Sequence, residues 1–325
     1  MQLRTLLLAV QAVVICALVG VLGYRLFMHR AVPGSLPQGF AQHTEGSIYS
    51  TYFEPQASTT MDNKPQWAEK PSRNTINHDT LNDRFDYTVE KPADVFRIAV
   101  LGDSFAYGLY VDTDKNFAEL LEEKFANNAQ CTKRIEILNF GVPAYDIEFA
   151  AERYRLRAAK YHPDAVLWFT EAGDFQQVND VFQPILRKHA AAAAPGVPFD
   201  FFNMPGDVLN TIWPLAREEA RALMTTDEML EREMAALEKF RSDFDGSLLL
   251  FSIPPAMQGF NVRSALTDFA ATTASTTVIL DVVTPWDTTL QVLPDDPHPN
   301  ELGSQKIAAA LYETLVQGAF APCTR

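Results

Sequence analysis

The chain has 325 residues, 47% of them hydrophobic, so it is long enough and apolar enough to bury a full core. This composition excludes an intrinsically disordered protein. The formal net charge of −14 argues against a nucleic-acid partner, because an acidic surface repels a phosphate backbone. We expect one folded domain of ordinary size with appendages.

The first 30 residues predict a membrane anchor. Leu6 to Tyr24 is a 19-residue stretch without a charge, bounded by Arg4 and Arg25, and a helix of that length crosses a bilayer. We expect a single transmembrane helix here, with the lipid bilayer as its partner. A cleaved signal peptide and a buried helix are the alternatives; a signal peptide usually has a shorter apolar region and a small-residue cleavage site, which is not found after Gly20. The flanking arginines do not decide the orientation.

Residues 31–94 are predicted to form an extended stem. They are rich in Pro, Gln, Asn, Ser and Thr and show no sustained helical or strand period. The segment nevertheless contains more aromatic residues than a fully disordered linker would. We therefore expect its second half, around Ile76 to Tyr87, to be ordered against the main domain.

From residue 95 onward, short β-rich runs alternate with helical segments. Strands are expected at 97–101, 134–139, 165–169, 247–253 and 277–282, and helices at 116–127, 147–160 and from 299 onward. Pro299 and Glu301 suit the first turn of the last helix. Such alternation predicts an α/β domain over residues 95–325, with a parallel sheet of about five strands covered by helices on both faces.

Residues 175–237 form an insertion larger than an ordinary crossover between two strands. It contains the alanine run Ala190 to Ala194, which we expect to be helical, and a charged helix from about Pro214 to Phe240. Because the insertion follows the third strand, we expect it near the carboxyl edge of the sheet. It is either a lid or wall over a substrate or a plain crossover with additions.

The tripeptide Gly102-Asp103-Ser104 directly follows the first strand of the predicted sheet. This puts a serine hydroxyl at the carboxyl edge of a buried strand, where α/β enzymes keep nucleophiles. Near the other end of the chain, Asp295 stands three residues before His298. A histidine base and a carboxylate that orients it are the groups that a serine nucleophile needs at neutral pH.

Two further acids lie beside these residues. Asp296 is the other candidate partner of the histidine. Because it stands only two residues before His298, we expect Asp296 to be a solvated loop charge. Asp103 is expected to cap a turn or helix and not to join the triad. A G-D-S triplet or a D-x-x-H pair alone is a weak signal, whereas both together, in this order, favour a serine hydrolase.

At this point the chain resembles the GDSL, or SGNH, hydrolase superfamily over roughly residues 96–315. The segment Gly102–Phe105 is similar to the nucleophile block of that superfamily, and Asn139–Pro143 is similar to its glycine block. The segment Asp295–Asn300 is similar to the final block, which holds the acid and the histidine.

The resemblance implies a three-layer, flavodoxin-like fold and catalysis through an acyl-serine. It implies that Ser104 is the nucleophile, His298 the base and Asp295 the residue that orients the base. It also implies that the backbone N–H groups of Ser104 and Gly141 are oxyanion donors. A plain strand-ending turn is the other interpretation of Gly141.

The third block departs from the superfamily pattern. Gly173 stands where the superfamily has an asparagine, within the segment Glu171-Ala172-Gly173-Asp174. Loss of one oxyanion donor typically costs about 100- to 1000-fold in rate, so we expect weakened catalysis. The Gly173 N–H or the amide of Asn179 are the candidate replacements. Glu171 is either a new polar group of the site or a solvated charge.

No cofactor and no metal are expected, because the six histidines are dispersed and the cysteines and histidines form no cluster. Of the three cysteines, Cys16 lies in the apolar segment. Cys131 and Cys323 would make one disulfide if the main domain lies outside the cytoplasm.

The sequence therefore predicts a membrane-anchored serine esterase with its domain in the periplasm or on the cell surface. We expect it to release acyl groups, acetyl among them, from carbohydrate, envelope or lipid substrates. An O-acyltransferase that uses the same triad is the second hypothesis. A binding or assembly module with weakened catalysis is the third.

Overall fold

The computed structural model describes residues 40–42, 45–65, 67–129, 131–196, 206–318 and 323. The predicted membrane anchor, Leu6 to Tyr24, lies outside these residues. Among the helices that are described, none is both long enough and apolar enough to cross a membrane.

Five parallel strands form the central sheet, as predicted. The spatial order β6-β5-β7-β8-β9 corresponds to 2-1-3-4-5 in chain order, which is the flavodoxin-like arrangement. Four of the five strands agree with the predicted positions to within two residues at each end, and β9 ends three residues early. The bounds are β5 Val95–Leu101, β6 Arg134–Asn139, β7 Ala165–Phe169, β8 Ser247–Phe251 and β9 Thr276–Ile279.

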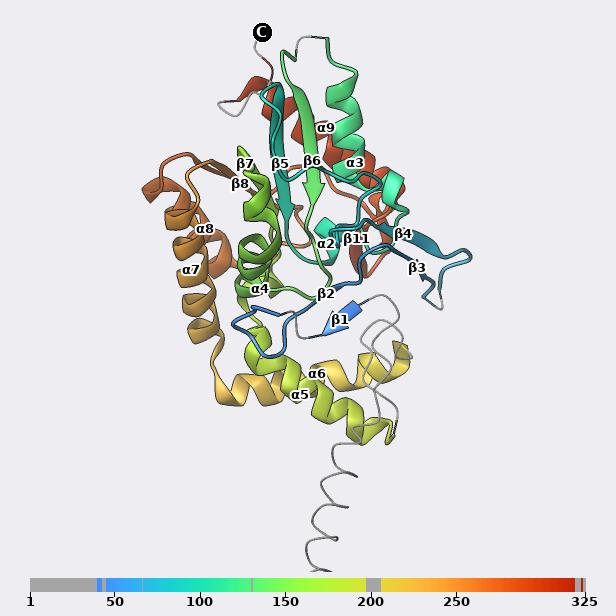
Figure 1. Ribbon diagram of the computed structural model, residues 1–325. Helices are drawn as coiled ribbons and strands as arrows, with labels where there is room; N and C mark the ends of the chain where they lie inside the picture. The colour runs from blue at the N-terminus through green and yellow to red at the C-terminus, as the bar shows by residue number, and fades with distance from the viewer. Residues whose placement is uncertain are drawn as a thin grey trace, which may run out of the picture.

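Helices cover both faces of this sheet, which makes three layers (Figure 1). Helices α4, α7 and α8 pack on one face, and α3 and α9 pack on the other. Their bounds are α3 Phe117–Ala126, α4 Ile147–Arg153, α7 Thr226–Asp243, α8 Phe260–Thr272 and α9 Glu301–Gln317. The predicted α/β fold is confirmed.

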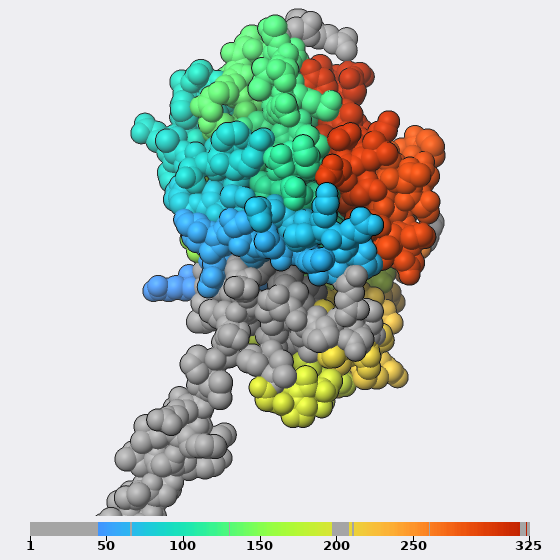
Figure 2. Space-filling view, turned by 90° about the vertical axis from the view of Figure 1, so that its right-hand side faces the viewer, coloured from blue at the N-terminus to red at the C-terminus, as the bar shows by residue number. Residues whose placement is uncertain are grey.

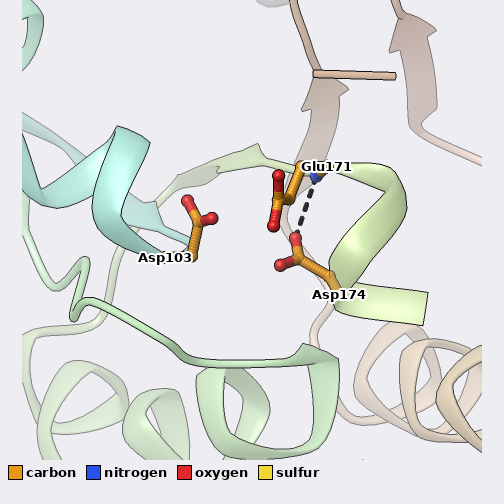
Figure 3. A group of neighbouring side chains, drawn as sticks. All are labelled: Asp103, Glu171 and Asp174. Atoms are coloured by element: carbon orange, nitrogen blue, oxygen red, sulfur yellow. Dashed lines mark hydrogen bonds between the residues drawn. The ribbon is translucent and has the colours of Figure 1, made fainter. Parts of the chain in front are cut away.

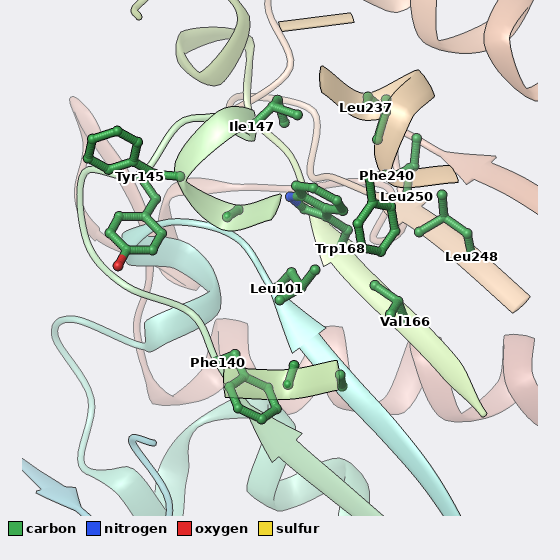
Figure 4. Packing of buried hydrophobic residues seen from close by; sticks show 14 of the residues in the cluster. Leu101, Phe140, Tyr145, Ile147, Val166, Trp168, Leu237, Phe240, Leu248 and Leu250 are labelled. Carbon is green, nitrogen blue, oxygen red and sulfur yellow. The ribbon is translucent and has the colours of Figure 1, made fainter. Parts of the chain in front are cut away.

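The apolar pattern of the strands assigns side chains to the two faces. Along β5, Ala99 and Leu101 belong to the core beneath α4 and α7, whereas Ile98 and Val100 belong to the core beneath α3 and α9. Trp168 is fully buried and packs edge-on against Phe240 of α7 with ring centroids 4.9 Å apart (Figure 4). A strand that is buried on both faces has the continuous apolar sequence seen here.

Two predicted helices are interrupted. After α4, the chain continues as a π-helical turn over Tyr154–Ala158 and a 3-10 turn over Ala159–Tyr161. The charged helix predicted from Pro214 to Phe240 is instead two helices, α6 (Gly206–Leu223) and α7. The break follows from Thr225, whose side chain caps α7 and forms a capping box with Glu228.

The insertion forms a helical layer of its own. Helix α5 (Asn179–Ala193) includes the alanine run except for its last residue, Ala194, and the apolar residues of α5 pack with those of α6 and with Met229 of α7. This cluster is separate from the two cores of the sheet, and its helices lie beyond one end of the sheet (Figure 1).

The described part of the predicted stem is ordered in both of its halves. The chain forms two small antiparallel pairs, β1 (Phe40–Gln42) with β2 (Phe53–Pro55) and β3 (Thr59–Asn63) with β4 (Ser72–Ile76). Buried polar contacts then fasten the stem to the loop that follows the nucleophile. Asn74 donates to the Val111 carbonyl at 3.1 Å, and Asn82 donates to the Tyr107 carbonyl at 2.7 Å.

The disulfide that the sequence left conditional is present. Cys131, between α3 and β6, is bonded to Cys323 near the end of the chain. Both half-cystines join the core beneath α3 and α9.

Candidate active site

The nucleophile candidate Ser104 lies where the chain reverses its direction of winding across the sheet. β5 has β6 on one side and β7 on the other, so the carboxyl end of β5 is the topological switch point. Gly102 makes the turn with φ 136°, and a Cβ there would lie 2.7 Å from the Phe169 carbonyl oxygen. Asp103 accepts a hydrogen bond from the Phe105 N–H and so caps the short helix α2 (Ser104–Tyr107), as predicted.

The fold brings His298 to this serine from 194 residues away in the sequence. His298 Nε2 lies 2.7 Å from Ser104 Oγ. The imidazole stacks on Phe105 with centroids 4.2 Å apart, and Tyr110 meets it edge-on at 5.1 Å. Two aromatic rings therefore fix the plane of the imidazole, so its nitrogen stays directed at the hydroxyl.

The acid against this imidazole is Asp296 and not Asp295, which corrects the sequence prediction. Asp296 Oδ1 lies 2.5 Å from His298 Nδ1 and also accepts the His298 backbone N–H at 3.1 Å. The physical reason is local conformation. His298 lies in a short strand, β11 (Asp296–Pro299), which pairs with β10 (Gln291–Leu293), and alternate residues of a strand share a face. Asp295 precedes this strand and is exposed.

The surroundings of Asp296 favour the ionised form of its carboxyl group. Burial alone would raise the pKa of Asp296, but the hydrogen bonds and the charge of His298 outweigh burial and hold this pKa below its ordinary value. The pKa of Tyr110 is raised to about 12 by burial and by the Asp296 charge, so this phenol stays neutral. This electrostatic pattern suits Asp296 as an anionic partner of the imidazole.

The Gly141 N–H is not free to donate to an oxyanion, contrary to what the resemblance implies. It donates to the side chain of Asn139 at 3.0 Å. The residue is a glycine for a packing reason, because a Cβ there would lie 2.6 Å from the Tyr107 nitrogen and 2.8 Å from the Ala106 carbonyl carbon. Gly141 thus lets the loop after β6 approach α2 closely, while the Asn139 side chain holds both segments by donating to the Ala106 carbonyl at 3.0 Å.

Glu171 takes the space where a side chain at position 173 would lie. Gly173 sits in a 3-10 turn, Ala172–Phe175, and a Cβ built on it would overlap Glu171 Oε1. The other candidate replacement is engaged elsewhere: the amide of buried Asn179 donates to the Ala144 carbonyl at 2.7 Å. A carboxyl group therefore stands where the resemblance leads one to expect an amide.

Three carboxyl groups gather beside the nucleophile: Asp103, Glu171 and Asp174 (Figure 3). One oxygen from each group lies within 4.8 Å of the other two, a spacing that would suit the ligands of a cation. Asp174 also accepts the Glu171 backbone N–H at 2.9 Å. Burial and the Glu171 charge raise the pKa of Asp103 well above its ordinary value. Burial, then the charges of Asp103 and Glu171, does the same for Asp174.

The pKa of Glu171 is raised mainly by burial. The positive charges of His298 and Arg217 oppose this shift, whereas the negative charge of Asp296 adds to it. Arg217 belongs to α6, so the inserted helices extend an electrostatic influence to the catalytic edge.

Sequence reasoning considered Asp296 but set it aside, and it missed the contacts of Phe105 and Tyr110 with the imidazole. A signal for Asp296 was present, because Asp296 and His298 each precede a proline and the residue before proline is restricted to extended conformations. An extended D-P-H-P segment puts its first and third side chains on one face. The two aromatic residues had no such signal, since only the packed fold brings them to the imidazole.

No protein-family model and no curated protein matches this chain. Several solved structures do match it. A G-D-S-L family protein from Desulfitobacterium hafniense DCB-2 has 14% identity and a TM-score of 0.39, covering 67% of this chain and 98% of its own. A family 3 carbohydrate esterase from Clostridium thermocellum has 13% identity and a TM-score of 0.37, covering 68% and 96%.

A psychrotrophic esterase from Pseudoalteromonas sp. has 15% identity and a TM-score of 0.39, covering 67% of this chain and 96% of its own. The first of these structures is named as a G-D-S-L family protein, and the other two are named as esterases. All three TM-scores lie below 0.5, and the chemistry that follows rests on the geometry around Ser104.

Proposed function

We propose that this protein is a serine-dependent esterase that removes acyl groups from hydroxyl groups of its substrate, with Ser104, His298 and Asp296 as the catalytic triad. The single observation that carries the proposal is the pair of contacts at His298. Nε2 lies 2.7 Å from the serine hydroxyl, and Nδ1 lies 2.5 Å from a carboxylate. A nucleophile, a base and a group that orients the base form the set that acyl transfer requires.

The reaction follows from these positions. Ser104 Oγ attacks the carbonyl carbon of the ester while His298 Nε2 accepts the hydroxyl proton. The imidazolium, stabilised by Asp296, then gives that proton to the leaving alcohol, and the acyl group remains on Ser104. Water attacks the acyl-serine in the second half, with His298 again accepting and returning a proton.

The oxyanion donors are fewer than the sequence leads one to expect. Ser104 begins α2, and the first N–H groups of a helix have no partner inside the helix. The Gly141 N–H is bonded to Asn139, and Gly173 has no side chain to donate. We therefore propose slow turnover, in line with the loss of about 100- to 1000-fold expected for one missing donor.

For the substrate we propose O-acylated carbohydrate, acetyl esters among them, with lipid esters as the alternative. We propose further that residues 1–30 anchor the protein in a membrane and that residues 31–94 connect this anchor to the domain. The Cys131–Cys323 disulfide supports a domain outside the cytoplasm, because disulfides persist in oxidising compartments.

The test is covalent labelling of the protein with a fluorophosphonate probe, followed by mass spectrometry of the adduct. Wild type should be labelled at Ser104, while Ser104→Ala and His298→Ala should lose the label although both remain folded by circular dichroism. A folded wild-type protein that takes up no label would contradict an activated serine.

A further inference from the structure

The helix that carries the proposed nucleophile, α2, is a single turn of four residues. Its backbone makes few hydrogen bonds of its own: the Tyr107 N–H donates to the Asp103 carbonyl at 2.9 Å, and the Gly108 N–H donates to the Ser104 carbonyl at 3.1 Å. One turn of helix is not stable by itself, because so few bonds do not offset the entropy lost in fixing the backbone. The direction of Ser104 therefore depends on the groups that hold α2 from outside.

Three buried asparagine side chains hold the carboxyl end of α2. They come from different parts of the chain: Asn82 from the stem, Asn116 from the start of α3 and Asn139 from the end of β6. Asn82 and Asn116 each donate to the Tyr107 carbonyl at 2.7 Å. Asn139 donates to the Ala106 carbonyl at 3.0 Å. None of the three asparagines is more than 1% exposed, so water does not compete for these bonds.

Asn82 is the member of this set that comes from the stem and not from the α/β domain. Figure 2 shows the described stem (blue) lying against that domain. The Asn82 amide is oriented by Thr113, whose hydroxyl donates to Asn82 Oδ1 at 2.6 Å. The same hydroxyl oxygen accepts the Thr75 N–H of β4 at 2.7 Å, so its proton is free for Asn82. Asn82 Nδ2 is thereby directed at the Tyr107 carbonyl.

At the other end of α2, the position of Ser104 allows little error. Its Oγ lies 2.7 Å from His298 Nε2, and the imidazole is held separately by Asp296 and Tyr110. A tilt of α2 would therefore move the hydroxyl away from the base. A misplacement of about 1 Å between reacting groups can lower a rate about 100-fold.

We propose that Asn82 is a positioning residue of the esterase: its amide fixes the carboxyl end of α2 and so keeps the Ser104 hydroxyl against His298. This role rests on the function proposed above. It also makes the stem around Asn82 a part of the catalytic unit, and not only a connection between an anchor and a domain.

The first experiment compares two buried asparagines of the stem. Asn82→Leu removes the bond to the Tyr107 carbonyl of α2. Asn74→Leu removes a bond of the same kind to the Val111 carbonyl, which lies beyond α2. Because both asparagines are buried and each loses a hydrogen bond, both variants should unfold at a lower urea concentration than wild type.

The readout is kcat per active site. Active sites are counted by labelling with fluorophosphonate to completion, and kcat with 4-nitrophenyl acetate is divided by that count, so unfolded molecules do not enter the value. In Asn82→Leu, kcat per site should fall about 10- to 100-fold, with KM within about twofold of wild type. In Asn74→Leu, kcat per site should stay within about twofold of wild type.

Two outcomes would overturn the positioning role and leave the esterase proposal standing. One is an Asn82→Leu variant with the kcat per site of wild type. The other is an equal loss in Asn82→Leu and Asn74→Leu, because Asn82 would then act only through the stability of the fold. A wild type that neither hydrolyses 4-nitrophenyl acetate nor takes up the label overturns the esterase proposal instead.

Asn82→Asp tests the hydrogen bond itself and keeps the shape of the side chain. An ionised carboxylate has no proton to donate to the Tyr107 carbonyl, whereas a protonated carboxyl donates one and can still accept from Thr113. The ratio of kcat per site, variant over wild type, should therefore rise as the pH is lowered from about 8 to about 5, since burial raises the pKa of a carboxyl group. A ratio that stays low at acidic pH would contradict the positioning role.

Discussion

At the scale of single residues, His298 is held from three directions. Asp296 binds one ring nitrogen, Phe105 lies under the ring and Tyr110 meets its edge. The other nitrogen is thereby directed at Ser104. The imidazole cannot rotate without losing these contacts. The Asp296 carboxylate also selects the tautomer with the proton on Nδ1, which leaves Nε2 to accept the serine proton.

The neighbouring acids at 295 and 296 provide a matched pair of variants. Asp296→Asn should lower kcat by about 10³- to 10⁴-fold, because an amide does not stabilise the imidazolium and favours the wrong tautomer. Asp295→Asn changes the charge by the same amount one residue away and should stay within about twofold of wild type, as surface changes usually do. The measurement is kcat with 4-nitrophenyl acetate. Equal losses in both variants would contradict the assignment of Asp296.

At the scale of elements, the turn after β7 determines the electrostatics of the site. It brings Glu171 and Asp174 against Asp103 at the end of β5. Burial raises the pKa of all three groups; the charge of Glu171 adds to this for Asp103, and the charges of Asp103 and Glu171 add to it for Asp174. Below these raised pKa values the groups are neutral. Above them, negative charge accumulates beside the position where the ester oxyanion forms.

Glu171→Gln removes one of these charges and keeps the volume of the side chain. Because the pKa of Glu171 is raised, wild type and variant should both be neutral at this position at acidic pH and have similar kcat/KM. As pH rises through the raised pKa, wild type gains the charge, so the ratio of variant to wild type should climb to about tenfold. Glu313→Gln, on the exposed side of α9, is the control. A ratio that does not vary with pH would mean that Glu171 does not influence the oxyanion.

At the scale of the whole molecule, the C-terminus is tied back to the sheet. The Cys131–Cys323 bond closes a loop of 192 residues and joins the end of the chain to the connection between α3 and β6. Cross-links of long loops stabilise mainly by restricting the unfolded chain. The same layer, α3 with α9, supports the segment that delivers His298.

Removal of this bond should weaken the fold without altering the chemistry. Replacing both cysteines by serine should lower the free energy of unfolding by about 2 to 5 kcal/mol in a urea titration. Reduction of the wild type should shift its midpoint by a similar amount, and fluorophosphonate labelling of the folded variant should be retained. A midpoint that neither reduction nor replacement changes would argue that the bond contributes nothing to stability.

Much of the fold could be predicted because its causes are local. Runs such as Ala165–Phe169 are apolar throughout, as a strand buried on both faces must be. The side chain of Asn116 caps the start of α3. The helix predicted from 214 to 240 failed because the capping box at Thr225 was not recognised. The boundary of a helix depends on such end signals more than on its apolar stripe.

The sequence by itself determined the parallel sheet, the position of Ser104 at the carboxyl edge of that sheet and the identity of His298 as the partner of Ser104. Strand patterns and short motifs could be recognised because they depend on residues that are neighbours in the chain. Only the tertiary structure decided that Asp296 faces the imidazole, that Asn139 occupies the Gly141 N–H and that Glu171 fills the space beside Gly173. It alone brought Asn82 of the stem to the Tyr107 carbonyl. Each of these depends on backbone direction and on packing between segments far apart in the chain, which spacing along a sequence does not encode.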